Sequence, residues 1–144
     1  MPTFIGIGLA LVVVAALGRI VGLDRDRAFY PVVLIVVASY YVLFAVMAGG
    51  HGLIIELLVF ALFAATALLG FRISLWIAAA GLAAHGLFDF TRHWFLEGNG
   101  VPEWWPAFCG AFDLLAAVGL ATILLLEKRG SAWSAVPRVN GTGA

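Results

Sequence analysis

Five long apolar runs occupy most of this chain. A helix needs about 20 apolar residues to cross the hydrocarbon core of a bilayer, and each run has roughly that length. Between the runs stand DRDR, AGGHG, FR and EGNGVPE, which are charged or rich in the helix breakers glycine and proline. The sequence therefore predicts an all-α protein, an integral membrane bundle of five transmembrane helices. The runs cover approximately residues 3–23, 28–47, 53–71, 73–96 and 104–126.

The composition excludes an ordinary soluble domain. Hydrophobic residues make up 64 % of the 144 residues and charged residues 11 %, whereas soluble domains carry about 45–50 % apolar and about 25 % charged residues. The formal net charge is zero, which gives no indication of nucleic acid as a partner. The single cysteine excludes a disulfide within the chain. We expect one transmembrane domain over residues 1–128 and a flexible cytoplasmic tail over 129–144.

The basic residues predict an orientation in the membrane. With five spans, one side receives seven of the eight Lys and Arg residues, all except Arg92. Because cytoplasmic loops carry an excess of Lys and Arg, we expect the N-terminus outside and the C-terminus in the cytoplasm. The expected location is a bacterial inner (plasma) membrane. The first run has no charged side chain before Arg19, so we interpret it as a retained helix and not as a signal peptide.

Ionisable residues gather in the outer half of the predicted bundle. Those of the fourth run fall within an arc of about 100° on one helical face. A charge at mid-bilayer costs about 2.5–3.5 kcal/mol, so these groups must face one another, a cation or a water-filled pocket. The residues concerned are His85, Asp89, Arg92 and His93 in the fourth run, Glu56 in the third, and Asp113 in the fifth, where Asp113 follows Cys109 at i, i+4 spacing.

The pattern in the fourth run is typical of a metal site. Histidine and carboxylate side chains four residues apart ligate zinc from one face of a helix. We therefore predict His85, Asp89 and His93 as ligands of a divalent metal, zinc above others. The three residues span about 12 Å along the helix axis, so one i, i+4 pair is expected to be completed by a carboxylate from another helix.

The predicted function is a metal-dependent enzyme of the hydrolase type, acting on a lipid or another membrane-soluble substrate. Glu56 and Asp113 would serve as ligand, general base towards a metal-bound water, or proton shuttle. Arg92 would orient an anionic headgroup or pair with a carboxylate. Two alternatives stay open: a metal-free acid–base isomerase or cyclase acting on an isoprenoid or lipid, and a non-enzymatic protein that handles metal ions or protons. A hydrogen-bonded network that only holds the bundle together is a further interpretation.

The segments AGGHGLIIE, HGLFDFTRH and VPEWWPAFCGAFD resemble a family of small bacterial integral membrane proteins classed as a domain of unknown function. The resemblance implies a membrane fold and no established activity. Arg92 departs from the family pattern, which has a histidine there. The matching positions are Gly49, Gly50, Glu56, His85, Asp89, His93, Cys109 and Asp113.

Membrane lipids are the expected partners, with a lipid or small hydrophobic molecule as substrate. Gly18 and Gly22 are small residues four positions apart in the first run, a spacing that suits packing within one chain or association of two copies. We interpret Tyr40 and Tyr41 as packing residues.

Overall fold

The computed structural model describes residues 1–12, 26–96 and 100–134. Within these ranges the structure is helical and contains no strand, which confirms the all-α prediction for this part of the chain. Gly18 and Gly22 lie outside the described residues. The elements are α1 (Pro2–Leu11), α2 (Phe29–Met47), α3 (Leu53–Arg72), α4 (Leu75–Thr91), the 3-10 turn η3 (Arg92–Trp94) and α5 (Trp105–Ser134).

Three of the described helices are long and apolar enough to cross a membrane, over Phe29–Met47, Leu53–Arg72 and Trp105–Lys128. This finding is compatible with a membrane protein. Helix α4 has 17 residues, or about 26 Å of helix, and is shorter than the fourth apolar run. Helix α1 has 10 residues and covers only residues 3–11 of the first apolar run. The count of five spans and the orientation stay predictions.

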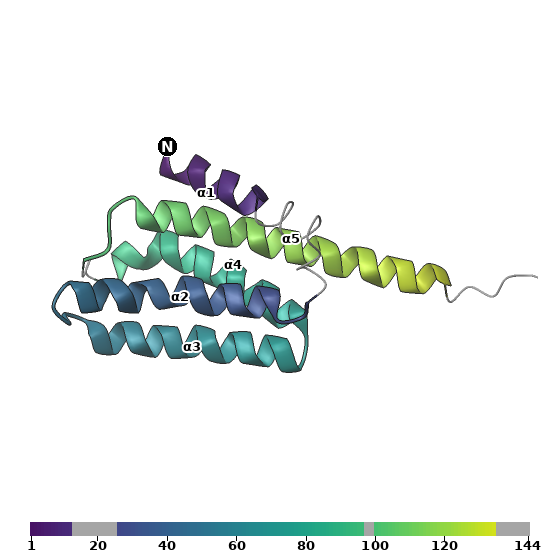
Figure 1. The fold of residues 1–144 in the computed structure, drawn as a ribbon, viewed down its shortest axis with the longest axis horizontal. Helices are drawn as coiled ribbons and strands as arrows, with labels where there is room; N and C mark the ends of the chain where they lie inside the picture. The colour runs from purple at the N-terminus through teal and green to yellow at the C-terminus, as the bar shows by residue number, and fades with distance from the viewer. Residues whose placement is uncertain (13–25, 97–99, 135–144) are drawn as a thin grey trace, which may run out of the picture.

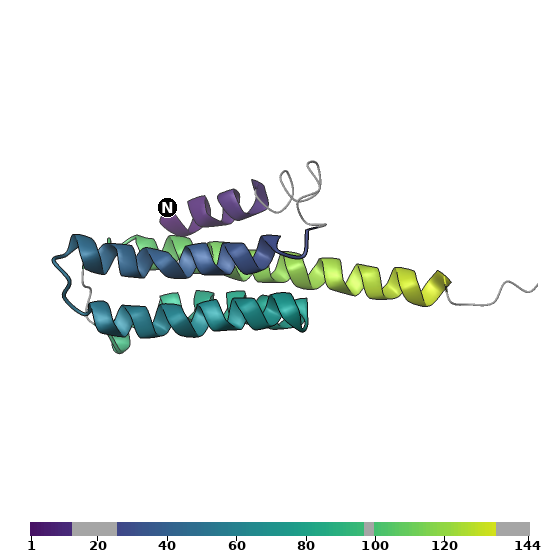
Figure 2. The same ribbon diagram turned by 60° about the horizontal axis from the view of Figure 1, so that its bottom comes forward.

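The helices form a bundle in which neighbours in sequence pack side by side. Helix α2 packs against α3, and α4 packs against both α3 and α5, while α1 runs along α5 (Figure 1). Helix α5 extends beyond the other helices at its C-terminal end, as Figure 2 shows. It ends at Ser134, so residues 129–134 of the predicted tail are helical, and residues 135–144 lie outside the described ranges.

The helix ends near the site follow from local sequence. Gly49, Gly50 and Gly52 have φ angles of +83°, +85° and +69°, a conformation that glycine adopts without steric cost. They form the tight turn that joins α2 to α3. At the same end of the bundle, α4 gives way at Arg92 to the tighter turn η3. The residues after Thr91 therefore leave the helical face on which the sequence placed them.

Two glycines let the backbones of α4 and α5 touch. A Cβ atom on Gly86 would lie 2.9 Å from the carbonyl oxygen of Gly110, and a Cβ on Gly110 would lie 3.0 Å from that of Gly86. The first distance is shorter than real Cβ atoms show and the second is at the limit, so a side chain at Gly86 would force the two backbones apart. The contact sets His85, which precedes Gly86, and Cys109, which precedes Gly110, at the same level of the bundle.

The interior of the bundle is apolar on the side of His85 and Cys109 that faces away from the α2–α3 turn. Its buried side chains include Leu34, Ala78, Leu82, Ala116 and Leu120, which are each at most 2 % exposed. These residues come from α2, α4 and α5 and belong to one continuous core. The polar site therefore lies towards the end of the bundle that carries the α2–α3 turn and η3.

Candidate metal centre

Four potential metal ligands meet between α4 and α5: His85, Asp89, Cys109 and Asp113. One ligand atom from each residue lies within 4.8 Å of those of the other three. Each side chain belongs to a residue that is at most 2 % exposed. Each helix contributes two residues at i, i+4 spacing, which places both on one helical face. We call these four residues the His–Asp–Cys–Asp cluster.

Hydrogen bonds connect the cluster internally and to α2. His85 Nδ1 lies 2.6 Å from Asp113 Oδ2, and the Cys109 thiol donates to the same oxygen at 3.7 Å. The Tyr41 hydroxyl on α2 donates to Asp89 Oδ1 at 2.5 Å. Tyr41 is 2 % exposed, so this bond is shielded from solvent. A third helix therefore holds one of the potential ligands in place.

Three buried polar atoms of the cluster have no hydrogen-bond partner among the described residues: His85 Nε2, Asp89 Oδ2 and Asp113 Oδ1. Buried polar atoms in folded proteins are almost always paired, and leaving one unpaired costs about 1–3 kcal/mol. A network that only joined the helices would gain by pairing these atoms. Their lone pairs are available to a metal ion instead.

The charges of the cluster also fit a bound cation. Two carboxyl groups and a thiol meet around one imidazole, and no Lys or Arg ion pair reaches them among the described residues. His85 Nδ1 lies near an oxygen of both aspartates, and one imidazolium balances at most one carboxylate. A second ionised carboxylate in a buried site is costly, and a divalent ion would compensate its charge. Zinc binds cysteine, histidine and carboxylate ligands at about 2.0–2.3 Å. The donor set present here therefore fits zinc.

Glu56 and Arg92 form a separate buried pair beside the cluster. An Nη2 hydrogen of Arg92 is donated to Glu56 Oε1, and Glu56 is 1 % and Arg92 3 % exposed. The Arg92 guanidinium carbon also lies 4.4 Å from the centre of the Tyr41 ring, where a cation is attracted to the aromatic face. Arg92 thus pairs with a carboxylate, one of its two expected roles. Glu56 does not join the ligand group.

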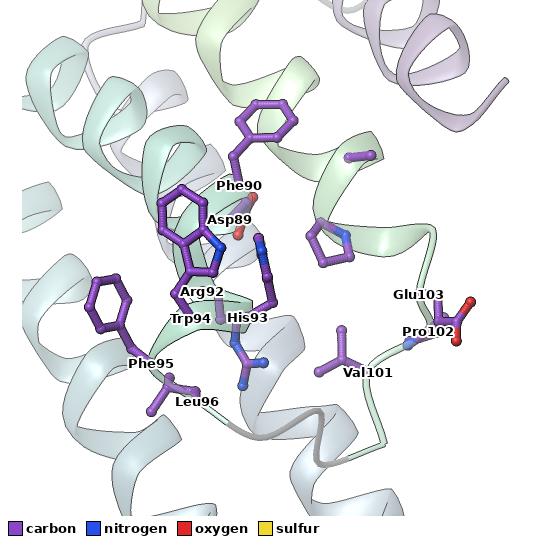
Figure 3. Close-up of a pocket in the computed structure, with 12 residues that line it drawn as sticks. Asp89, Phe90, Arg92, His93, Trp94, Phe95, Leu96, Val101, Pro102 and Glu103 are labelled. Atoms are coloured by element: carbon purple, nitrogen blue, oxygen red, sulfur yellow. The ribbon is translucent and has the colours of Figure 1, made fainter.

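His93 also lies apart from the cluster. Because α4 ends at Thr91, His93 falls on η3, where its side chain is exposed. It lines a cavity of about 810 Å³ between the end of α4, η3 and the first turn of α5, and Asp89 lines the same cavity. In Figure 3 the His93 side chain points into this space towards Asp89, whereas the Glu103 carboxylate points away from it. We call this space the η3 cavity.

The structure brings together three of the residues predicted from the sequence, His85, Asp89 and Asp113, and adds two that the prediction did not assign. The i, i+4 spacing of Cys109 and Asp113 repeats that of His85 and Asp89, and this signal could have identified the thiol as a ligand. No comparable signal exists for Tyr41. It follows another tyrosine, and only the rotation of α2 about its axis decides which hydroxyl reaches Asp89.

Comparisons with models of protein families, with curated proteins and with solved structures found no match to this chain. The resemblance to a family of unknown function therefore stays a prediction. The chemistry of the site rests on the geometry of its own residues.

Proposed function

We propose that this chain is a membrane protein that binds one divalent transition-metal ion, with zinc preferred, in the His–Asp–Cys–Asp cluster. The observation that carries the proposal is the convergence of four buried potential ligands, with one atom from each lying within 4.8 Å of those of the other three. Among the described residues, Asp89 Oδ2 and Asp113 Oδ1 also lack a hydrogen-bond partner. A metal ion would bind these carboxylates and compensate their negative charge.

The donor types select among metals. Thiolate and imidazole are the ligands of zinc and of other transition metals, whereas magnesium and calcium prefer sites built from oxygen alone. Cys109 and His85 therefore favour a transition metal. Zinc accepts a mixed set of sulfur, nitrogen and oxygen ligands in tetrahedral geometry, and four protein ligands are present.

The number of ligands favours holding the ion over hydrolysis. Structural zinc sites have four protein ligands, while catalytic sites have three and leave one position for water or substrate. The cluster offers four, and each is at most 2 % exposed. Hydrolysis would require one of the four ligands to leave the metal. Among the functions expected from the sequence, metal-ion handling without catalysis therefore has the best support from the geometry.

Elemental analysis of the full chain, purified in mild detergent after growth with added zinc, tests the proposal. We expect about one equivalent of zinc per chain. Asp113→Asn preserves the shape of the side chain and removes its charge, so the protein should fold but lose the metal. Tyr40→Phe is the control, because Tyr40 packs on the Trp105 ring with centroids 4.8 Å apart and lies outside the cluster. Wild-type protein that stays free of metal would overturn the proposal.

A further inference from the structure

The cluster is enclosed by protein, so an ion needs a route to reach it. No cluster residue is more than 2 % exposed. Asp89 lines the η3 cavity, and Cys109 lines a different cavity of about 510 Å³ between α1, α2 and α5. The chemistry of the two cavities decides which one an ion can use.

The cavity at Cys109 is unsuited to a hydrated ion. Apart from Cys109, its walls are formed by valine, leucine and aromatic side chains and contain no carboxylate, histidine, lysine or arginine. An ion that left water there would find no replacement ligands and would pay the cost of transferring a charge into an apolar environment. A membrane-soluble molecule would suit this space better than a metal ion does.

The η3 cavity offers ligands from its opening to the cluster. His93 is exposed at η3 and points into the cavity (Figure 3). Asp89 forms the inner wall, and its Oδ2 atom has no hydrogen-bond partner among the described residues. Both residues line this one cavity. An ion released by His93 therefore finds an available carboxylate oxygen in the same space.

The positive charge of the Arg92 side chain, which lies beside this route, is neutralised. Arg92 lines the η3 cavity and would repel an incoming metal ion if its charge were free. Its guanidinium is instead paired with the buried Glu56 carboxylate and lies over the Tyr41 ring. The pairing with Glu56 therefore leaves the route open to a divalent cation.

We propose that the η3 cavity is the loading path of the metal centre and that His93 is its entry ligand, which binds a divalent transition-metal ion transiently and passes it to Asp89. This inference rests on the proposed metal-binding function. It gives His93 a role in the rate of metal exchange and none in the final coordination. A neutral imidazole suits this role because histidine is a common ligand of zinc.

The test measures the rates of zinc loading and release and, separately, the Kd and stoichiometry of zinc binding at equilibrium. Metal-free full-length protein in detergent is mixed with Zn²⁺ in a stopped-flow instrument, with a fluorescent zinc chelator as reporter, and release is then measured with excess chelator. His93→Ala should slow both loading and release about tenfold, which corresponds to a barrier higher by ~1.4 kcal/mol. Its Kd and stoichiometry should equal those of the wild type, because a residue on the path affects both directions equally.

His51→Ala is the matched control, since His51 is an exposed histidine in the α2–α3 turn that does not line the η3 cavity, and it should load at the wild-type rate. Wild-type loading rates in His93→Ala would overturn the inference. A loss of stoichiometry in His93→Ala would do so as well, since it would make His93 a permanent ligand. Failure of the wild-type protein to bind Zn²⁺ would instead overturn the proposed function itself.

Discussion

At the scale of single residues, the orientation of the Asp89 carboxylate depends on a tyrosine from another helix. The Tyr41 hydroxyl donates to Oδ1 of Asp89, while Oδ2 lies 3.6 Å from His85 Nδ1 and accepts no hydrogen bond from the described residues. Groups that hydrogen-bond to a metal ligand fix its orientation and typically contribute 10–100-fold to metal affinity. Tyr41 therefore acts on the proposed metal through Asp89 and is a positioning residue.

Tyr41→Phe should weaken zinc binding about 10–100-fold without abolishing it. The phenyl ring keeps the aromatic face beneath Arg92, so the change removes the hydroxyl and little else. The measurement is a competition titration of purified protein against a chelator of known zinc affinity. Tyr40→Phe, one position earlier, should bind zinc as tightly as the wild type. Equal affinity in Tyr41→Phe and the wild type would show that Asp89 does not need this hydrogen bond.

The sequence was informative about residue types and less so about their partners. It placed His85, Asp89 and Asp113 in one site, because burying ionisable side chains in an apolar bundle forces them to meet. It grouped His93 with them because the helical period was extended past Thr91, where the structure turns into η3. It expected Glu56 to be a ligand, a general base or a proton shuttle, whereas the structure pairs Glu56 with Arg92. This pairing depends on how α3 is rotated against the end of α4, which the sequence does not show.

At the scale of helices, the site depends on how closely α4 and α5 approach. Gly86 and Gly110 bring the two backbones into contact, and two of the potential ligands, His85 and Cys109, directly precede them in sequence. The apolar runs predicted where helices lie. They carried no information on which helices share this contact, because every run contains small residues.

Gly86→Ala should lower both stability and zinc affinity. The added methyl would lie 2.9 Å from the Gly110 carbonyl oxygen, which is backbone and yields only if the helices separate. Overpacking of this kind costs about 1–3 kcal/mol, and separation moves the α4 ligands away from those on α5. Thermal unfolding in detergent and a zinc titration measure the two effects.

Gly8→Ala on α1 is the control for this change. A Cβ on Gly8 meets nothing within 4 Å, and alanine favours a helix by about 1 kcal/mol over glycine. This variant should keep its zinc affinity and be at least as stable as the wild type. A Gly86→Ala protein that matched the wild type in both measurements would contradict the importance of the α4–α5 contact.

At the scale of the whole molecule, the buried ionisable side chains of the described residues gather in one part of the bundle. The cluster, the Glu56–Arg92 pair and the η3 cavity lie towards the end of the bundle that carries the α2–α3 turn and η3. At the other end, the Arg27 side chain donates to the carbonyl oxygen of Phe71 at 2.5 Å, and the core between the two ends is apolar. This one-sided arrangement suits a site that exchanges ions with one face of a membrane and does not conduct them across it.

The proposed site holds one zinc ion, coordinated by Cys109, His85 and two aspartates. X-ray absorption spectroscopy at the zinc edge of the loaded full-length protein tests it most directly, because it reports the atoms bound to the metal. We predict one sulfur ligand at about 2.3 Å and three nitrogen or oxygen ligands at about 2.0–2.2 Å, with the sulfur signal lost in Cys109→Ser. A spectrum of wild-type protein without a sulfur ligand, or one unchanged by Cys109→Ser, would contradict the assignment of the metal to this cluster.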